Sequence, residues 1–209
     1  MFKFHKMSLG LMFLIFSSLA CPPNSPLLPA LAQPNYGAPE SRRGSQSDRP
    51  RLKLPLTSPR IVVKKRARRL LLYSGNDLVR TYRVGLGLNP VGDKVREGDR
   101  RTPEGAFYIF TKNSKSAFYL SLGLSYPNAA HAKRGLREGL ITKAQYDDIL
   151  RALKAKRRPL QNTALGGDIY IHGNGARSDW TWGCVALENE DIRELFDVVK
   201  VGMTVTIEP

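Results

Sequence analysis

Cys184 and His172 are the residues whose types and spacing best suit chemistry. Cys184 stands in the run Thr-Trp-Gly-Cys-Val-Ala-Leu, and His172 precedes it in Ile-Tyr-Ile-His-Gly. A thiol beside a histidine can act as a nucleophile, because the imidazole takes the thiol proton. The alternative for a lone thiol is an inert buried cysteine. His172 ends an apolar segment and precedes a glycine, so it is a better base than His131, which no predicted strand adjoins.

A metal site is the rival use of these side chains. Zinc takes about four protein ligands, or three and a water. Beyond the N-terminal apolar run the chain offers Cys184, His131 and His172, without the close spacing of paired ligands. We therefore expect no metal site.

The surroundings of Cys184 favour a reactive thiol. Gly183 lets the backbone turn sharply and bring N–H groups close to a ligand. A helix capped by Asn189 is predicted to follow, and its positive end would lower the pKa of the thiol if it pointed at the sulfur. The polar stretch 174–179 upstream favours an exposed thiol.

The N-terminal segment has the composition of a secretory signal. Two lysines precede an apolar run at 9–20, too short for a membrane span, and residues 30–32 (ALA) form a cleavage site. We expect export to the periplasm or cell envelope, with residues 1–32 as the signal and cleavage after Ala32. Lipidation at Cys21 and retention of the segment as an anchor are the alternatives. Exported proteins pair their thiols, so an unpaired cysteine there favours a nucleophile.

Positive charge gathers ahead of the folded domain. The net charge is +15, and residues 42–69 carry many of the basic side chains, with Asp48 as their one acid. Residues 33–58 contain almost no apolar side chain before Leu52, which predicts a disordered basic linker. We expect this tail to bind the anionic cell envelope and not nucleic acid, which an exported protein rarely meets. A soluble basic protein without such a partner is the alternative, and we expect a monomer.

Residues 59–209 are predicted to form the folded domain. Short β-branched or alternating segments predict strands at 61–63, 69–73, 78–84, 106–110, 118–122, 168–171 and 205–207. Two helices are predicted, one at the capping box of Thr142 and Gln145 and one at Asn189. Strands and helices do not alternate, so the expected fold is mainly β, a twisted sandwich or barrel with two or three short helices. The insertion 125–159 is expected to form a lid or to pack on the sheet.

The order of these features resembles the L,D-transpeptidase catalytic domain, a family of bacterial peptidoglycan enzymes. A strand ending in His172 and Gly173, a polar loop and the run 181–187 look like the family's signature. The resemblance covers roughly residues 60–209. Three further segments match in kind and order: 98–107, with the family's Thr-Pro-x-Gly pattern, 85–87 and 202–207.

Three positions depart from the family's common pattern. Thr181 stands where members commonly have Ser, Trp182 where many have His or a small residue, and Ala186 where many have Arg or Asn. The wording Asp-Trp-Thr-Trp is similar to a Gram-negative branch, some of whose members hydrolyse instead of cross-linking. The sequence therefore leaves open whether an amine or water accepts the acyl group.

The resemblance implies a peptidoglycan L,D-transpeptidase without a cofactor. The Cys184 thiolate would attack the bond between an L-diamino acid and the terminal D-Ala of a stem tetrapeptide. A thioester would form and pass to an acceptor amine. The first alternative is an L,D-carboxypeptidase or endopeptidase, in which water is the acceptor. The second is a catalytically inactive, basic envelope-binding module.

The resemblance also suggests supporting roles around this pair. Backbone N–H groups at Gly183 and Cys184 would hold the oxyanion, and Thr181 and Gly173 would help to shape or orient the site. Candidates for the group that orients the base are Thr181, Asp179 and a backbone carbonyl, although Asp179 equally suits a solvated loop acid. The expected substrate-binding side chains are Arg177, Trp182 and Tyr170, with Trp180 as a further wall residue.

Overall fold

The computed structural model describes residues 49–209. The predicted signal at 1–32, Cys21 and most of the predicted linker lie outside these residues. Within 49–209, no helix combines the length and apolar character that crossing a membrane requires.

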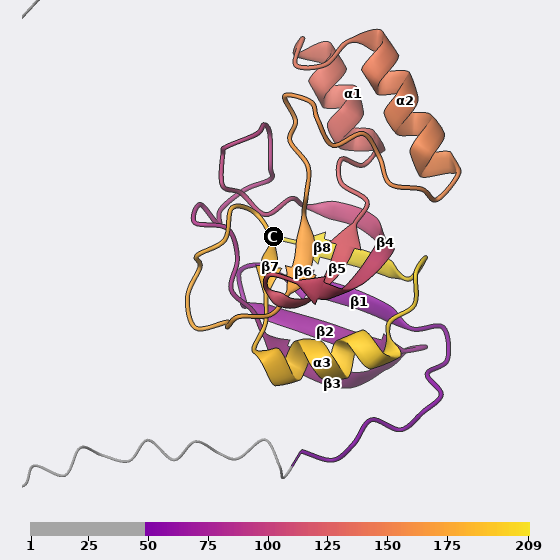
Figure 1. Ribbon diagram of the computed structural model, residues 1–209, viewed down its shortest axis with the longest axis vertical. Coiled ribbons are helices and arrows are strands. Elements are labelled where there is room, and N and C mark those ends of the chain that lie inside the picture. The colour runs from indigo at the N-terminus through magenta and orange to yellow at the C-terminus, as the bar shows by residue number, and fades with distance from the viewer. Residues whose placement is uncertain (1–48) are drawn as a thin grey trace, which may run out of the picture. The chain divides into compact units, whose positions relative to one another are not determined.

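Residues 49–209 form eight strands and three helices (Figure 1). The strands are β1 (Arg60–Lys64), β2 (Arg69–Ser74), β3 (Asp77–Arg83), β4 (Gly105–Ser116), β5 (Tyr119–Leu124), β6 (Tyr170–His172), β7 (Val185–Ala186) and β8 (Thr204–Glu208). The helices are α1 (Ala129–Arg137), α2 (Lys143–Lys154) and α3 (Asn189–Val198). The prediction of a mainly β fold with short helices is confirmed.

The strands form one bent sheet in the order β3-β2-β1-β8-β4-β5-β6-β7. Neighbours run antiparallel except β1 with β8 and β6 with β7. The first part of β4 pairs with β8, and its later part pairs with β5, so the sheet bends along this long strand. Its two halves face each other across one core, to which α3 contributes Ile192, Leu195 and Val199.

The sheet closes on itself just after β3. Gly85 and Ala186 each donate a backbone N–H to the other's carbonyl, at 2.9 and 2.8 Å. Since β3 and β7 are the two edges of the sheet, this pairing joins them. Glycine is needed because a Cβ at Gly85 would lie 2.3 Å from the Ser178 carbonyl oxygen, and one at Gly87 would lie 2.2 Å from that of Arg100. We call residues 85–88 the closing segment.

Helix α3 is tied to β3 by a polar clamp. Arg80 pairs with Glu194 at 2.7 Å, and the Tyr82 hydroxyl donates to the same carboxylate at 2.9 Å. The prediction that Asn189 caps this helix is wrong. The N-cap is Glu188, without a side-chain cap bond, because the Asn189 amide oxygen accepts the N–H of Asn174 instead.

Helices α1 and α2 form a hairpin with its own small core of Ala132, Ile141, Ile149 and Leu165. They project beyond the end of the sheet in Figure 1 but touch it at β4, where the His131 ring of α1 lies 5.9 Å from that of Phe107. The predicted capping box of α2 is present. Helix α1 escaped prediction because it is short and its fully buried positions are His131, Ala132 and Gly135, without a stripe of large apolar side chains.

The chain ahead of β1 lies against the domain, although the sequence placed residues 49–58 in the linker. Leu52 and Leu56 pack on the main core, and the Thr57 carbonyl accepts the N–H of Gly75 at 2.5 Å. The compact unit therefore begins at Arg49 and not at Pro59. Two leucines are enough to hold this segment in place because both pack against apolar side chains of the main core.

We expect Gly85→Ala to destabilise the domain, because its methyl group must displace the Ser178 backbone. The expected loss is about 2 kcal/mol or more, which corresponds to a fall of roughly 4–8 °C in Tm for a domain of this size. Thermal unfolding followed by circular dichroism measures it. Thr81→Ala, on the exposed side of β3, is the control and should unfold close to wild type. A Gly85→Ala protein with the wild-type Tm would contradict the closure.

Candidate active site

Strands β6 and β7 bring Cys184 and His172 onto adjacent backbones. The parallel register pairs Ile171 with Val185 and His172 with Ala186, so Cys184 comes level with Tyr170. Tyr170 and His172 lie two residues apart on β6 and therefore share one face. Continued one residue ahead of β7, this register puts the thiol and the imidazole on the same face, two residues apart along the strand direction.

The Cys184 thiol is held by the backbone that leads into β6. Its sulfur accepts the N–H of Tyr170 at 3.4 Å and donates to the carbonyl of Asp168 at 3.5 Å. Burial of the sulfur raises the pKa of Cys184 to about 11, although the Tyr170 N–H opposes this. The expectation that α3 would lower this pKa is wrong for the free protein, because the loss of hydration dominates.

The His172 ring is buried and oriented by its own loop. Its Nδ1 lies 2.8 Å from the Gly173 carbonyl oxygen. A carbonyl can only accept a hydrogen bond, so Nδ1 carries the proton and Nε2 keeps a lone pair. Rings of Phe118 and Trp180 lie against the imidazole, with centroids 4.6 and 5.5 Å away. Burial lowers the pKa of His172, while the bond to Gly173 opposes this, so the ring is neutral at neutral pH.

Two threonine hydroxyls shape the turn that carries Cys184. The Thr181 hydroxyl accepts the N–H of Gly183 at 3.2 Å and donates to the Cys184 carbonyl at 2.8 Å. The Thr102 hydroxyl accepts the N–H of Gly87 at 2.9 Å and lies 3.4 Å from the same carbonyl. Thr181 therefore positions the turn that carries Cys184 and does not orient His172. Thr102 begins the Thr-Pro-x-Gly pattern noted in the sequence, but its place beside this turn could not be predicted from that pattern.

Asp179 is neither a solvated acid nor the group that orients His172. Its carboxylate forms a bidentate ion pair with Arg68, the shortest contact being 2.7 Å. It also accepts the N–H of Leu86 at 2.9 Å. Asp179 thus anchors the loop before Cys184 to the closing segment. The contact that orients the His172 ring comes instead from the backbone carbonyl of Gly173.

A cavity of about 660 Å³ opens beside the thiol. It is lined by Lys94, Glu97, Gly98, Gln145, Gln161, Asn162, Thr163, Ala164, Gly166, Gly167, Asp168, Ile169, Trp182 and Cys184. Gln145 comes from α2, so the helical hairpin supplies part of the wall, as a lid would. Trp182 is 69% exposed, and the Arg100 guanidinium lies 4.9 Å from its ring centroid.

The other two expected substrate-binding residues do not line this cavity. The Tyr170 ring lies 6.4 Å from that of Phe110, and its hydroxyl is 3.4 Å from the Asp168 carboxylate. Arg177 lies on an exposed loop, where its carbonyl accepts from Arg83. Trp182 is thus the member of the three that the structure brings to the thiol.

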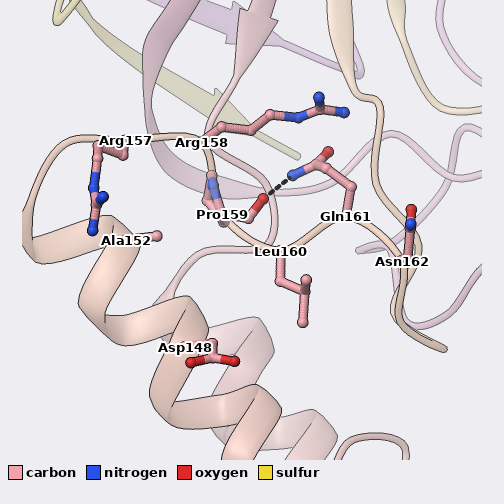
Figure 2. A pocket seen from close by; sticks show the side chains of 8 residues that line it. All are labelled: Asp148, Ala152, Arg157, Arg158, Pro159, Leu160, Gln161 and Asn162. Carbon is pink, nitrogen blue, oxygen red and sulfur yellow. Dashed lines mark hydrogen bonds between the residues drawn. The ribbon is translucent and has the colours of Figure 1, made fainter.

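A second hollow of about 580 Å³ adjoins the first (Figure 2). Gln161 and Asn162 line both, and the Gln161 amide donates to the Pro159 carbonyl at 2.7 Å. Arg157 and Arg158 give the second hollow two guanidinium groups. Arg158 pairs with Asp168 at 2.8 Å, so the guanidinium of Arg158 lies where the second hollow meets the thiol cavity.

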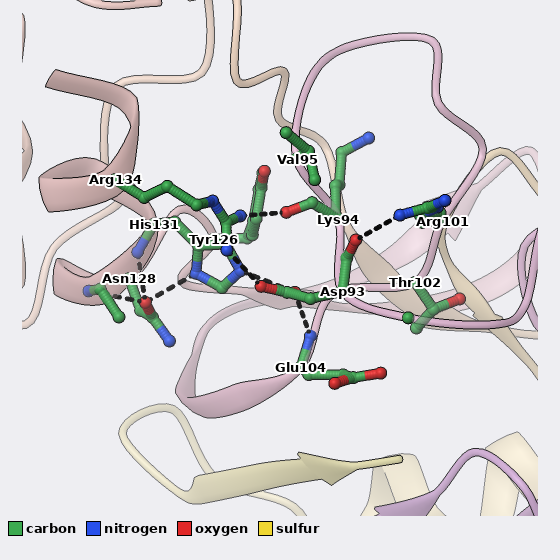
Figure 3. Close-up of polar contacts among 12 residues, drawn as sticks. Asp93, Lys94, Val95, Arg101, Thr102, Glu104, Tyr126, Asn128, His131 and Arg134 are labelled. Carbon is green, nitrogen blue, oxygen red and sulfur yellow. Dashed lines mark hydrogen bonds and ion pairs between the residues drawn. The ribbon is translucent and has the colours of Figure 1, made fainter. Parts of the chain in front are cut away.

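A polar cluster that the sequence did not reveal ties α1 to the loop after the closing segment (Figure 3). The Asp93 carboxylate lies 3.0 Å from His131 Nε2 and 2.7 Å from an Arg134 guanidinium nitrogen. It also accepts the N–H of Glu104 at 2.8 Å. These hydrogen bonds hold the pKa of Asp93 well below its usual range, although burial acts in the opposite direction. His131 is therefore a structural residue of this cluster.

A cluster of His, Cys, Asp and Glu side chains suited to a metal ion does not occur between residues 49 and 209.

The chain belongs to the L,D-transpeptidase catalytic domain family, whose model (YkuD) matches residues 58–207. A comparison with curated proteins gave no match. The family match and the observed strand order together establish the expected fold.

The solved structures to which the chain is similar are distant in sequence. The chain is similar to the helical cell shape determining protein Pgp2 from Campylobacter jejuni, with 23% identity, a TM-score of 0.48 and coverage of 72% of this chain and 47% of that one. It is also similar to Bdellovibrio bacteriovorus Bd1075, with 22% identity, a TM-score of 0.48 and coverage of 73% of this chain and 48% of that one. An L,D-transpeptidase from Xylanimonas cellulosilytica shares 15% identity, with a TM-score of 0.46 and coverage of 77% of this chain and 64% of that one. The chain therefore spans about half the length of the first two.

We expect alkylation of Cys184 in the free protein to be slow at neutral pH and to accelerate steeply with pH. Because its pKa is raised to about 11, the thiolate fraction grows about tenfold per pH unit below that value. Iodoacetamide labelling between about pH 7 and pH 10, read by peptide mass spectrometry, measures the rate. The urea-unfolded protein is the control, with a thiol pKa near about 8.5. A folded-state rate that levels off below about pH 9 would contradict the burial effect.

Proposed function

We propose that this protein is a peptidoglycan L,D-transpeptidase. Its donor substrate would be a stem tetrapeptide, cleaved between the L-centre of a diamino acid and the terminal D-Ala. The observation that carries the proposal is the placement of Cys184, in the wall of a cavity, on the same face of β6 and β7 as a neutral, oriented His172. Membership of the family supports it.

The reaction begins with transfer of the thiol proton to Nε2 of His172. In the free protein the thiol donates to the Asp168 carbonyl, so its side chain first turns toward the ring. The resulting thiolate and imidazolium stabilise each other, which offsets the raised thiol pKa. The sulfur then attacks the peptide carbonyl carbon, and the C=O electrons move to the oxygen.

The oxyanion needs a donor close to the sulfur. The Gly183 N–H already donates to Thr181, so we assign the Cys184 N–H to this role. The His172 imidazolium then gives its proton to the departing D-Ala nitrogen as the C–N bond breaks. A thioester on Cys184 and free D-Ala are the products of this half-reaction.

An amine of a second stem peptide completes the cycle by attacking the thioester. The hollow of Arg157 and Arg158 supports transfer, because it gives carboxylates of a second stem a place next to the thiol cavity. Hydrolysis by water is the alternative outcome of the same site. From the sequence we also propose that the protein is exported and that the basic N-terminal tail, residues 33–58, binds the anionic envelope.

Cys184→Ala is expected to abolish D-Ala release from purified sacculi, because the nucleophile is gone. His172→Ala should lower kcat/KM about 100- to 10,000-fold, the usual contribution of a general base. Muropeptide analysis by mass spectrometry measures both, with Thr81→Ala as a folded control. Wild-type activity in the Cys184→Ala protein would sink the proposal. Undiminished binding to sacculi with no turnover by wild type would favour the envelope-binding alternative.

Transfer and hydrolysis are separated by adding a free diamino acid to the same reaction. Transfer gives a tripeptide joined to the added amine, whereas hydrolysis gives free tripeptide. We expect the joined product to dominate for the wild-type protein.

Thr181→Val tests the loop that presents the nucleophile. The substitution keeps the side-chain volume but leaves the Gly183 N–H and the Cys184 carbonyl without their shared partner. We expect kcat/KM to fall about tenfold or more, since a buried group without its partner is costly. Thr181→Ser keeps the hydroxyl and should retain most activity in the same assay. Equal activity in both variants would contradict this role.

A further inference from the structure

Lys94 is a buried cation in the wall of the Cys184 cavity. Its side chain is 3% exposed, and it is the one cation among the described residues that line the cavity. Burying an ammonium group is costly unless its protons are hydrogen-bonded. Its charge also reaches the sulfur. Burial has the largest effect on the pKa of Cys184 and raises it. The Tyr170 N–H and the charge of Lys94 act in the opposite direction and lower it.

The ammonium of Lys94 has one donor more than its partners in the protein use. It donates to the Asp99 carboxylate at 2.8 Å and to the Arg96 carbonyl at 3.0 Å. Lys65, which is equally buried, offers a comparison within the same chain. Its three N–H groups meet Gly92, Thr102 and Glu104 at 2.5, 2.9 and 2.7 Å. Lys65 is thus fully satisfied, whereas Lys94 keeps a proton for a ligand.

Asp99 does not depend on Lys94 for its own hydrogen bonds. Its carboxylate accepts the backbone N–H groups of Val95, Arg96 and Arg101, at 2.7, 3.1 and 3.0 Å. These three bonds shape the loop without the lysine. The ion pair with Lys94 at 2.8 Å supplies the neutralising charge, so Asp99 in turn holds the ammonium in place.

The backbone of Lys94 is fixed by the cluster of Figure 3. The Arg134 guanidinium donates to the Lys94 carbonyl and also pairs with Asp93 at 2.7 Å. His131, on the same helix, holds Asp93 at 3.0 Å. Helix α1 thus fixes the loop on one side while Asp99 fixes the ammonium on the other. A binding group held in this way loses little freedom when a ligand arrives.

We propose that the Lys94 ammonium binds the terminal carboxylate of the donor stem peptide, one residue beyond the carbonyl that Cys184 attacks. This inference rests on the proposed function. A tetrapeptide places its carboxylate at that position, whereas a longer stem places a neutral amide there. Lys94 therefore selects stems that end at the residue to be released. The acids of the same wall, Glu97 and Asp168, would repel a misplaced carboxylate.

The test compares two donor peptides on the full-length protein: a stem tetrapeptide with a free terminal carboxylate and the same peptide with a terminal carboxamide. The wild-type protein is expected to favour the acid by roughly 10- to 100-fold in kcat/KM, the worth of a charge-assisted hydrogen bond. Lys94→Met should lose this preference by slowing with the acid and not with the amide. Lys133→Gln removes an exposed charge on α1 and should keep the wild-type preference.

The outcomes separate this inference from the proposed function. A wild-type protein that turns over acid and amide equally overturns the role of Lys94 and leaves the enzyme intact, and this comparison needs no variant to fold. A folded Lys94→Met protein that still prefers the acid also overturns it. A wild-type protein that releases no product from either peptide overturns the proposed function, and the inference with it.

Discussion

The joining of the two sheet edges by the closing segment is the constraint on which the site depends. Through Gly85 this segment pairs with Ala186, two residues after Cys184, and through Gly87 it pairs with Thr181, three residues before Cys184. The turn of Cys184 is therefore clamped at both ends by one short stretch of chain. At Gly85 and Gly87 the neighbouring backbone leaves no room for a side chain. This close packing restricts movement of the turn.

The electrostatics of the free site favour uncharged partners. Burial raises the pKa of the Cys184 thiol and lowers that of the His172 imidazole, so both stay neutral at neutral pH. Such a pair has little reactivity toward small electrophiles in solution. In the proposed reaction, charge would separate only when a substrate fills the cavity and supplies donors and acceptors of its own. Lys94 lies buried in the wall of the same cavity, where the proposed carboxylate would meet it.

The features that depend on short stretches of sequence could be predicted. The strands other than the two-residue β7, the capping box of α2 and the placing of His172 at a strand end beside Gly173 all follow from short runs of residues. Features that depend on long-range contacts could not be predicted. The pairing of Asp179 with Arg68 and the burial of Lys94 join segments far apart in the chain. Likewise, the pKa of Cys184 depends on how much water the folded cavity excludes.

The separate core of the helical hairpin has a consequence for how the cavity responds to a ligand. One wall, with Cys184, belongs to the barrel, while Gln145 belongs to a hairpin that packs mainly on itself. Parts of a protein with separate cores open with different free energies. Occupancy of the cavity bridges the two cooperative units. If a stem peptide binds there as proposed, it would contact both units, and amide exchange in α2 would slow although the helix belongs to the other core.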